Sequence, residues 1–267
     1  MDFIDTHLHP VHLAEKGLDV DELLASARNE SVEQFIFIGT DVHDSAKNIE
    51  LAVKHADTWA SVAQHPHEAS WFGGKERATL AQLADKPRVV AIGECGLDYY
   101  YEHSDREAQK DALHFQLELG IQHNLPFSFH VRGSKDDPQD AFDDFFAIID
   151  TYKGVAGVVH SFSANVSIME QIVARGLYMG FNGILTFSSD PQQLAVAVTA
   201  PLANIVLETD APFLTPAPFR GKVNEPKFVR LIAEFLASVR EESLQEIALQ
   251  TTHNAEKVFQ LDGRTDT

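Results

Sequence analysis

Short apolar runs alternate with longer amphipathic stretches along the 267-residue chain. The apolar runs are rich in β-branched and aromatic residues, as buried strands are. Near-continuous apolar strands are typical of a parallel sheet covered on both faces. We expect a helix over 20–28, another that Asp44 caps or opens, and a closing helix over 241–259. The predicted strands cover residues 3–9, 34–40, 59–65, 88–94, 126–130, 155–160, 177–181 and 204–208.

Eight strands that alternate with helices predict an α/β fold, a (β/α)8 TIM-like barrel. A length of 267 residues is usual for one such barrel. No glycine- or serine-rich linker, low-complexity tract or short repeat interrupts the alternation. With 44% hydrophobic and 23% charged residues, the composition is that of a folded protein. We therefore expect a single domain over residues 1–267.

The net charge limits how a nucleic acid can bind. Forty acidic residues against 21 basic ones give a formal charge of −19, the wrong sign for nonspecific electrostatic binding to DNA. Divalent cations in a site would offset part of this repulsion. The charge therefore excludes tight nonspecific DNA binding, but not an enzyme that processes a phosphodiester.

Cysteine content and hydropathy predict a cytoplasmic protein. One cysteine, Cys95, excludes an internal disulfide and a thiolate zinc cluster, as expected in a reducing compartment. The N-terminus has no basic signal region, and no apolar run reaches membrane-spanning length. We expect no membrane contact, no obligate protein partner and a monomeric chain.

Potential metal ligands stand at the ends of the predicted strands. Any single histidine is more often an ordinary core or surface residue, but the coincidence at so many strand ends favours a metal site. The carboxyl ends of parallel barrel strands converge where the active site of this architecture lies. Histidines in helices and loops are interpreted as structural: His12, His43, His55, His103, His114, His123 and His253. The strand-end residues are His7, His9, His65, Glu94, His130, His160 and Asp210.

Without His65, for which another role is expected, these strand-end residues are four imidazoles and two carboxylates. Such a set suits two ions better than one. It exceeds the shell of a tetrahedral ion, whereas two ions can share a bridging carboxylate, for which we choose Glu94. Mixed nitrogen and oxygen ligation leaves zinc, manganese, iron and magnesium open. The first of the two divalent ions is assigned to His7, His9, Glu94 and Asp210, and the second to Glu94, His130 and His160.

Motifs along the whole chain resemble the TatD-type metal-dependent deoxyribonucleases of the amidohydrolase-like barrels. The resemblance implies a TIM-like barrel that hydrolyses phosphodiesters, typically as a 3′-to-5′ exonuclease on single-stranded DNA, with metals on the same six ligands. One departure is Ala63, where the family usually has glycine. The matching segments are residues 3–9, 65–67, 93–100, 125–126, 130–132, 160–163, 207–212, 220–226 and 254–259.

The expected chemistry assigns roles to further residues. Water bound between two cations loses a proton near neutral pH and can attack phosphorus. Asp210 is the candidate general base, with a purely structural ligand role left open, and His65 is expected to hold the phosphate or shuttle a proton. Four more residues are candidates for substrate binding, although each alone is more often an ion pair or a packing residue: Arg132, Arg220, Lys222 and Tyr99, with Tyr100 beside it.

Two rival functions stay open. One is a hydrolase of esters or amides, such as an aminoacyl-ester deacylase, because metal-activated water serves those reactions equally well. The other is a binding or repair-associated protein with little turnover, against which the full ligand set argues. The expected partner is single-stranded DNA or a small phosphodiester substrate.

Overall fold

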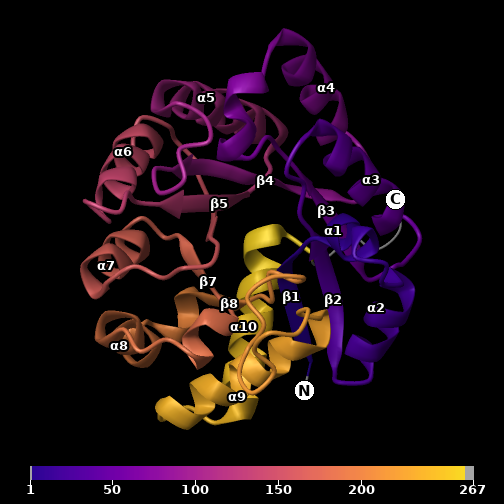
Figure 1. The fold of residues 1–267 in the computed structure, drawn as a ribbon, viewed down its shortest axis with the longest axis vertical. Coiled ribbons are helices and arrows are strands. Elements are labelled where there is room, and N and C mark those ends of the chain that lie inside the picture. Colours follow the sequence, from indigo (N-terminus) through magenta and orange to yellow (C-terminus); the bar gives the residue numbers. More distant parts are fainter. Residues whose placement is uncertain (1, 262–267) are drawn as a thin grey trace. The chain divides into compact units, whose positions relative to one another are not determined.

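The computed structural model describes residues 2–261, over which strands and helices alternate as the sequence predicts (Figure 1). The chain divides into two compact units. One contains residues 2–37 and 161–261, and the other contains Ile38–His160. All the predicted strands occur among the described residues, with ends that shift by a few positions.

The first unit contains two pairs of parallel strands: β1 (Phe3–Leu8) pairs with β2 (Val32–Phe37), and β7 (Tyr178–Phe181) pairs with β8 (Ile205–Leu207). A parallel bridge from Leu8 to Ala211 joins the two pairs. The helices of this unit are α1 (Pro10–Glu15), α2 (Val20–Arg28), α7 (Val166–Ala174), α8 (Pro191–Thr199), α9 (Val229–Val239) and α10 (Leu244–Phe259), with short 3-10 turns η2 (Gly183–Thr186), η3 (Leu202–Asn204) and η4 (Pro226–Phe228).

Buried polar side chains fasten β1 to the end of β8. Asp5 is fully buried and accepts hydrogen bonds from the Thr209 amide and hydroxyl, at 2.8 and 2.6 Å, and from the His7 amide at 3.3 Å. The Thr6 hydroxyl donates to the Leu207 carbonyl at 3.0 Å. Because β1 carries His7 and Thr209 precedes Asp210, these contacts fix the segments that bear the candidate ligands of this unit.

The second unit is a four-stranded parallel sheet. Its strands pair in the order β3 (Thr58–Val62), β4 (Val89–Asp98), β5 (Phe127–Arg132) and β6 (Gly157–Val159). A Cβ on Gly96 would lie 1.9 Å from the His130 carbonyl oxygen, so only glycine lets β4 and β5 approach this closely. The helices are α3 (Val42–Ala52), α4 (Gly74–Ala84), α5 (Arg106–His123) and α6 (Asp140–Ile149), with the 3-10 turn η1 (Pro66–Trp71).

Side-chain caps explain where several helices begin. Ser243 and Glu246 form a capping box that starts α10, three residues after the predicted start of the closing helix. The prediction that Asp44 caps a helix is wrong, although Asp44 does lie in the first turn of α3. Asp41 is the N-cap of α3 and accepts the amides of His43 and Asp44, because its extended backbone lets the side chain reach them. Asp44 lies inside the helix and accepts the Thr40 amide.

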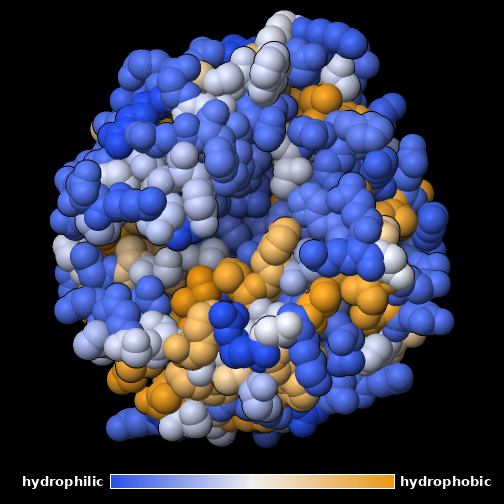
Figure 2. Space-filling model, viewed as in Figure 1, coloured by the Kyte–Doolittle hydropathy of each residue, from blue (hydrophilic) through white to orange (hydrophobic). Residues whose placement is uncertain are grey.

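The face seen in Figure 2 is mostly hydrophilic, with apolar residues in separate groups. Among the described residues, no helix combines the length and the apolar character that crossing a lipid bilayer requires.

Replacing Asp5 with asparagine should change how stability depends on pH. Burial raises the pKa of Asp5 to about 8, assisted by the Glu208 charge, although hydrogen bonds from Thr209 and His7 oppose the rise. An unfolded aspartate has a pKa of about 3.9, so between about pH 4 and pH 8 folding favours the protonated form. The free energy of unfolding of the wild type should therefore fall over this interval relative to Asp5→Asn, and the difference should level off above it.

Urea unfolding of metal-chelated protein at several pH values measures this difference. Asp136→Asn, in an exposed loop, is the control. Parallel stability curves for Asp5→Asn and the wild type would show that Asp5 does not titrate in this interval.

Candidate functional site

Three of the predicted ligands meet in the first unit. The Nε2 atoms of His7 and His9 lie 3.3 Å apart, and Asp210 Oδ1 lies 3.7 Å from the first and 3.2 Å from the second. All three residues are buried. Asp210 has a φ of 59°, the left-handed region that few non-glycine residues adopt. Its amide donates to the His7 carbonyl at 2.8 Å, which holds this backbone against β1.

The spacing of these atoms fits a metal ion. Ligand atoms about 2.1 Å from a tetrahedral ion lie roughly 3.4 Å from one another, and the three measured separations of 3.2, 3.3 and 3.7 Å surround this value. Two imidazoles and a carboxylate form a mixed donor set that suits zinc, manganese or iron. The His7, His9 and Asp210 cluster can therefore hold a divalent cation.

A second cluster surrounds the carboxylate of Glu94 in the other unit. Glu94 Oε1 lies 2.7 Å from His130 Nδ1, 2.9 Å from His160 Nε2 and 3.3 Å from His65 Nε2. Strand β4 supplies Glu94, β5 supplies His130, and His65 and His160 follow the ends of β3 and β6. A buried carboxylate oxygen that faces three imidazoles is a further arrangement able to hold a cation.

Electrostatics keep Glu94 ionised. Burial raises the pKa of the Glu94 carboxyl, but the nearby His160 and His65 and hydrogen bonds from His130 and His160 outweigh burial and hold the pKa well below its usual range. For His130, burial lowers the pKa, yet hydrogen bonds to Asp98 and Glu94 raise it overall. The cluster is therefore a buried anion with hydrogen-bonded imidazoles around it.

His65 is held in one tautomer. Burial lowers its pKa to about 4, although the Glu94 charge opposes this, so the ring is neutral near pH 7. The His67 amide donates to His65 Nδ1 at 3.1 Å, which makes Nδ1 the acceptor and leaves the proton on Nε2, facing Glu94. His65 thus presents an N–H toward the carboxylate.

The sequence predicts no metal-site role for two residues of this cluster, His67 and Asp98, although both lie in segments that resemble the family. Asp98 Oδ2 accepts from His67 Nε2 and from His130 Nε2, each at 2.9 Å. Burial raises the pKa of Asp98, but these hydrogen bonds outweigh it and lower the pKa strongly. Sequence signals for both exist: His65 and His67 have the same spacing as His7 and His9, and Glu94 and Asp98 are an even number of residues apart on β4, hence on one face.

Of the two alternatives left open for Tyr99, substrate binding and packing, its burial favours packing. Its side chain is 2% exposed, its hydroxyl donates to Asp144 at 2.8 Å, and the Arg106 guanidinium lies 4.0 Å from its ring centroid. Tyr99 directly follows β4, and these contacts direct its side chain toward α5 and α6. The neighbouring Tyr101 is 51% exposed.

The predicted cationic residues are distributed between the units. Arg132, at the end of β5, is exposed and lies 4.0 Å from the Tyr100 ring centroid. In the first unit, the Arg220 guanidinium lies 3.5 Å from the Phe187 ring centroid and Lys222 Nζ lies 5.3 Å from that of Phe219. Their contact with substrate stays a prediction.

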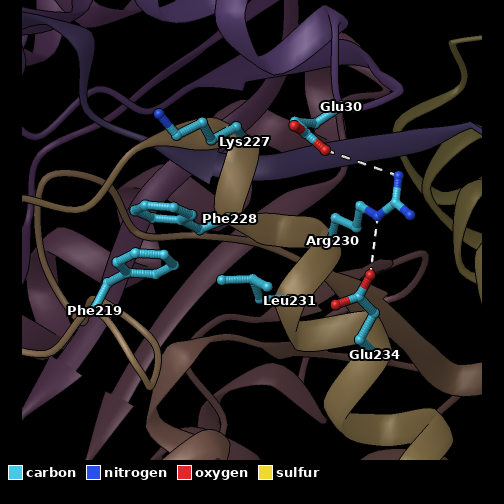
Figure 3. Close-up of a pocket in the computed structure, with 7 residues that line it drawn as sticks. All are labelled: Glu30, Phe219, Lys227, Phe228, Arg230, Leu231 and Glu234. Atoms are coloured by element: carbon cyan, nitrogen blue, oxygen red, sulfur yellow. Dashed lines mark hydrogen bonds and ion pairs between the residues drawn. The ribbon is translucent and has the colours of Figure 1, made fainter.

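A pocket elsewhere in the first unit lacks the features of a catalytic site (Figure 3). Phe219 and Phe228 stack in it with ring centroids 4.8 Å apart. Arg230 pairs with Glu234 at 3.0 Å and with Glu30 at 3.8 Å, so its charge is neutralised within the pocket. These contacts connect α9 to the end of α2 and are interpreted as structural.

Comparison with known proteins places both units in one family. The family profile described as TatD related DNase matches residues 4–260. An uncharacterized metal-dependent hydrolase of Bacillus subtilis, YabD, is 32% identical over 260 residues, which cover 97% of this chain and 99% of the relative. A protein of Erwinia tasmaniensis named 3′-5′ ssDNA/RNA exonuclease TatD is 35% identical over 91% of this chain and 94% of its own length.

Solved structures agree with the sequence comparison. The TatD homologue YjjV of Escherichia coli K12 superposes with a TM-score of 0.86 at 27% identity, covering 97% of this chain and 98% of the homologue. A TatD family hydrolase of Entamoeba histolytica gives a TM-score of 0.84 at 25% identity, over 97% and 98% of the two chains. The predicted (β/α)8 TIM-like fold is confirmed. The chain belongs to the TatD family of metal-dependent hydrolases.

Proposed function

We propose that this enzyme hydrolyses the phosphodiester bonds of single-stranded DNA from the 3′ end with the help of two divalent cations. The observation that carries the proposal is the Glu94 carboxylate oxygen, buried and within 3.3 Å of three imidazoles. The exonuclease name borne by relatives of 34–35% identity supports the substrate class.

Each unit offers ligands for one cation. His7, His9 and Asp210 would hold the first, and Glu94, His130 and His160 the second, while a bridging role for Glu94 stays a prediction from the sequence. Zinc, manganese, iron and magnesium are all compatible with oxygen and nitrogen donors. When bound, such cations acidify a water molecule and neutralise charge on the phosphate oxygens.

The protein's own groups would position the substrate and move protons. We assign to His65 the binding of a phosphate oxygen or the shuttling of a proton through its Nε2–H, because its pKa of about 4 keeps the ring neutral. Asp210 is assigned as proton acceptor, in addition to its role as a ligand. Arg132, Arg220 and Lys222 supply cations for phosphate contacts that the overall charge of −19 does not provide.

Short single-stranded DNA labelled at one end or the other tests the reaction. With a divalent metal added back to chelated protein, we expect a ladder of products that shortens from the 3′ end and disappears with excess chelator. Gel or chromatographic analysis of both labelled substrates gives the direction. A metal-loaded protein that cuts no phosphodiester would instead favour the ester or amide hydrolase, and a panel of esters and amides would follow.

Substitution of ligands tests the cation assignment. Glu94→Gln and His130→Ala should each lower the cleavage rate by roughly a hundredfold or more, because the transition-state charge loses its electrostatic partner. Each variant should also bind less metal, as elemental analysis after dialysis would show. His253→Ala, at an exposed position of α10, is the control. Full activity in a folded Glu94→Gln or His130→Ala protein would refute the assignment of the second cation.

Replacing Asp98 with asparagine should weaken metal binding without removing a proposed ligand. Asp98 accepts from His130 Nε2 and so fixes the ring that presents Nδ1 to Glu94. Loss of such a partner of a metal-binding histidine typically costs 10- to 100-fold in metal affinity. Competition with a chromogenic chelator measures the affinity, and Asp136→Asn is the matched control. Equal affinity in both variants would show that Asp98 does not orient His130 for metal binding.

A further inference from the structure

Exposed and half-buried aromatic and cationic side chains gather beside the Glu94 cluster, within the second unit. We call them the aromatic strip: Tyr100, Tyr101, His103, Arg132 and Lys135. The rings of Tyr101 and His103 are nearly parallel, with an interplanar angle of 4° and centroids 5.7 Å apart. The Arg132 guanidinium lies 4.0 Å from the Tyr100 centroid and 4.9 Å from that of Tyr101, and Lys135 Nζ lies 4.9 Å from that of Tyr100. The strip therefore combines flat apolar faces with positive charge.

The cations of the strip remain available to an anion. Within the described part of the chain, Arg132 and Lys135 contact aromatic rings and form no ion pair. An arginine that stacks on a ring keeps the N–H groups at its edge for a phosphate. The nearby Glu102 pairs with Arg106 at 2.7 Å, and Asp136, next to Lys135 in the sequence, is exposed. The strip is thus a local site for an anion on a strongly acidic protein.

Asp98 connects the strip to the candidate metal ligands. Its Oδ1 accepts the amides of Tyr100 and Tyr101, at 2.9 and 2.8 Å, while Oδ2 accepts from the imidazoles of His67 and His130. His67 also contacts the strip directly, with its ring centroid 5.5 Å from Tyr101 and 4.7 Å from His103. One carboxylate therefore fixes the tyrosine turn relative to His130.

We propose that the aromatic strip binds single-stranded nucleic acid, with a base stacked on Tyr101 and His103 and an adjacent phosphate held by Arg132 and Lys135. The proposal rests on the proposed function and adds to it a binding surface for the unpaired chain beyond the nucleotide being removed. Stacking accepts any base, because every base has a flat face, and it requires bases that are not covered by neighbours in a duplex. The strip thus accounts for a preference for single strands without a sequence preference.

Binding of a cleavage-resistant oligonucleotide tests the strip. Metal-loaded protein is titrated into a fluorescent phosphorothioate oligothymidylate, and anisotropy gives the dissociation constant. Tyr101→Ala and Arg132→Ala should each weaken binding at least about fivefold, the lower range for loss of one base–aromatic contact. Tyr101→Phe keeps the ring and should restore most of the affinity. Circular dichroism checks that each variant is folded.

Lys86→Ala is the matched charge control. Lys86 is exposed and precedes the amino end of β4, whereas the strip follows the carboxyl end of this ten-residue strand. Its replacement removes one positive charge and should leave the dissociation constant unchanged. Arg132→Ala should also reduce the slope of log affinity against log salt by roughly 0.7, the value for one phosphate contact on a single strand, and Lys86→Ala should not.

The outcomes separate this proposal from the proposed function. Wild-type affinity in both Tyr101→Ala and Arg132→Ala would overturn the proposed binding role of the strip, whether or not the enzyme cuts DNA. Equal affinity of the wild type for duplex and single-stranded DNA would overturn the assigned substrate class. Weakened binding in both variants, with rescue in Tyr101→Phe, would support the strip even if the enzyme cuts no phosphodiester.

Discussion

The burial of an ionised carboxylate, Glu94, is the constraint on which the second unit depends. A buried charge without partners is strongly unfavourable, so strands and loops must bring imidazoles to it. His130 lies on β5, while His65 and His160 follow β3 and β6, and all three reach the same oxygen atom. Gly96 makes this possible on one side, because only a glycine lets β4 lie so close to the backbone of His130. The close packing of the strands is therefore also what brings the imidazoles to the Glu94 carboxylate.

Asp98 extends this arrangement toward the surface. Its two oxygens accept different hydrogen bonds. Oδ2 accepts from imidazoles, and Oδ1 accepts the backbone amides of Tyr100 and Tyr101. A single buried carboxylate thus couples the geometry of a candidate metal ligand to that of an exposed aromatic surface. In the first unit, Asp5 has a comparable positioning role, since its carboxylate connects β1 to Thr209, the residue before Asp210. Buried acids without a proposed ligand role position the ligands in both units.

The burial of Tyr99 shows how the predicted end of a strand decides which side chains are expected to reach solvent. Ending the fourth strand at Glu94 leaves Tyr99 in a loop, where an aromatic residue can reach solvent. The strand continues to Asp98, and side chains alternate along it, so Gly96 and Asp98 share the face of Glu94 while Cys95 and Leu97 lie on the other. The same alternation, continued one residue past the end of β4, puts the Tyr99 side chain on the side of the buried Cys95 and Leu97.

The sequence by itself determined the order of strands and helices and the identity of the candidate ligands, because periodicity and strand-end chemistry are local properties. Both are visible in segments such as 3–9 and 88–94. Only the tertiary structure decided which atoms meet. The distances from Glu94 Oε1 to three imidazoles, the double role of Asp98 and the contact of Arg132 with Tyr100 and Tyr101 join residues tens of positions apart. Such contacts depend on strand register and side-chain packing across the whole sheet, which no local pattern specifies.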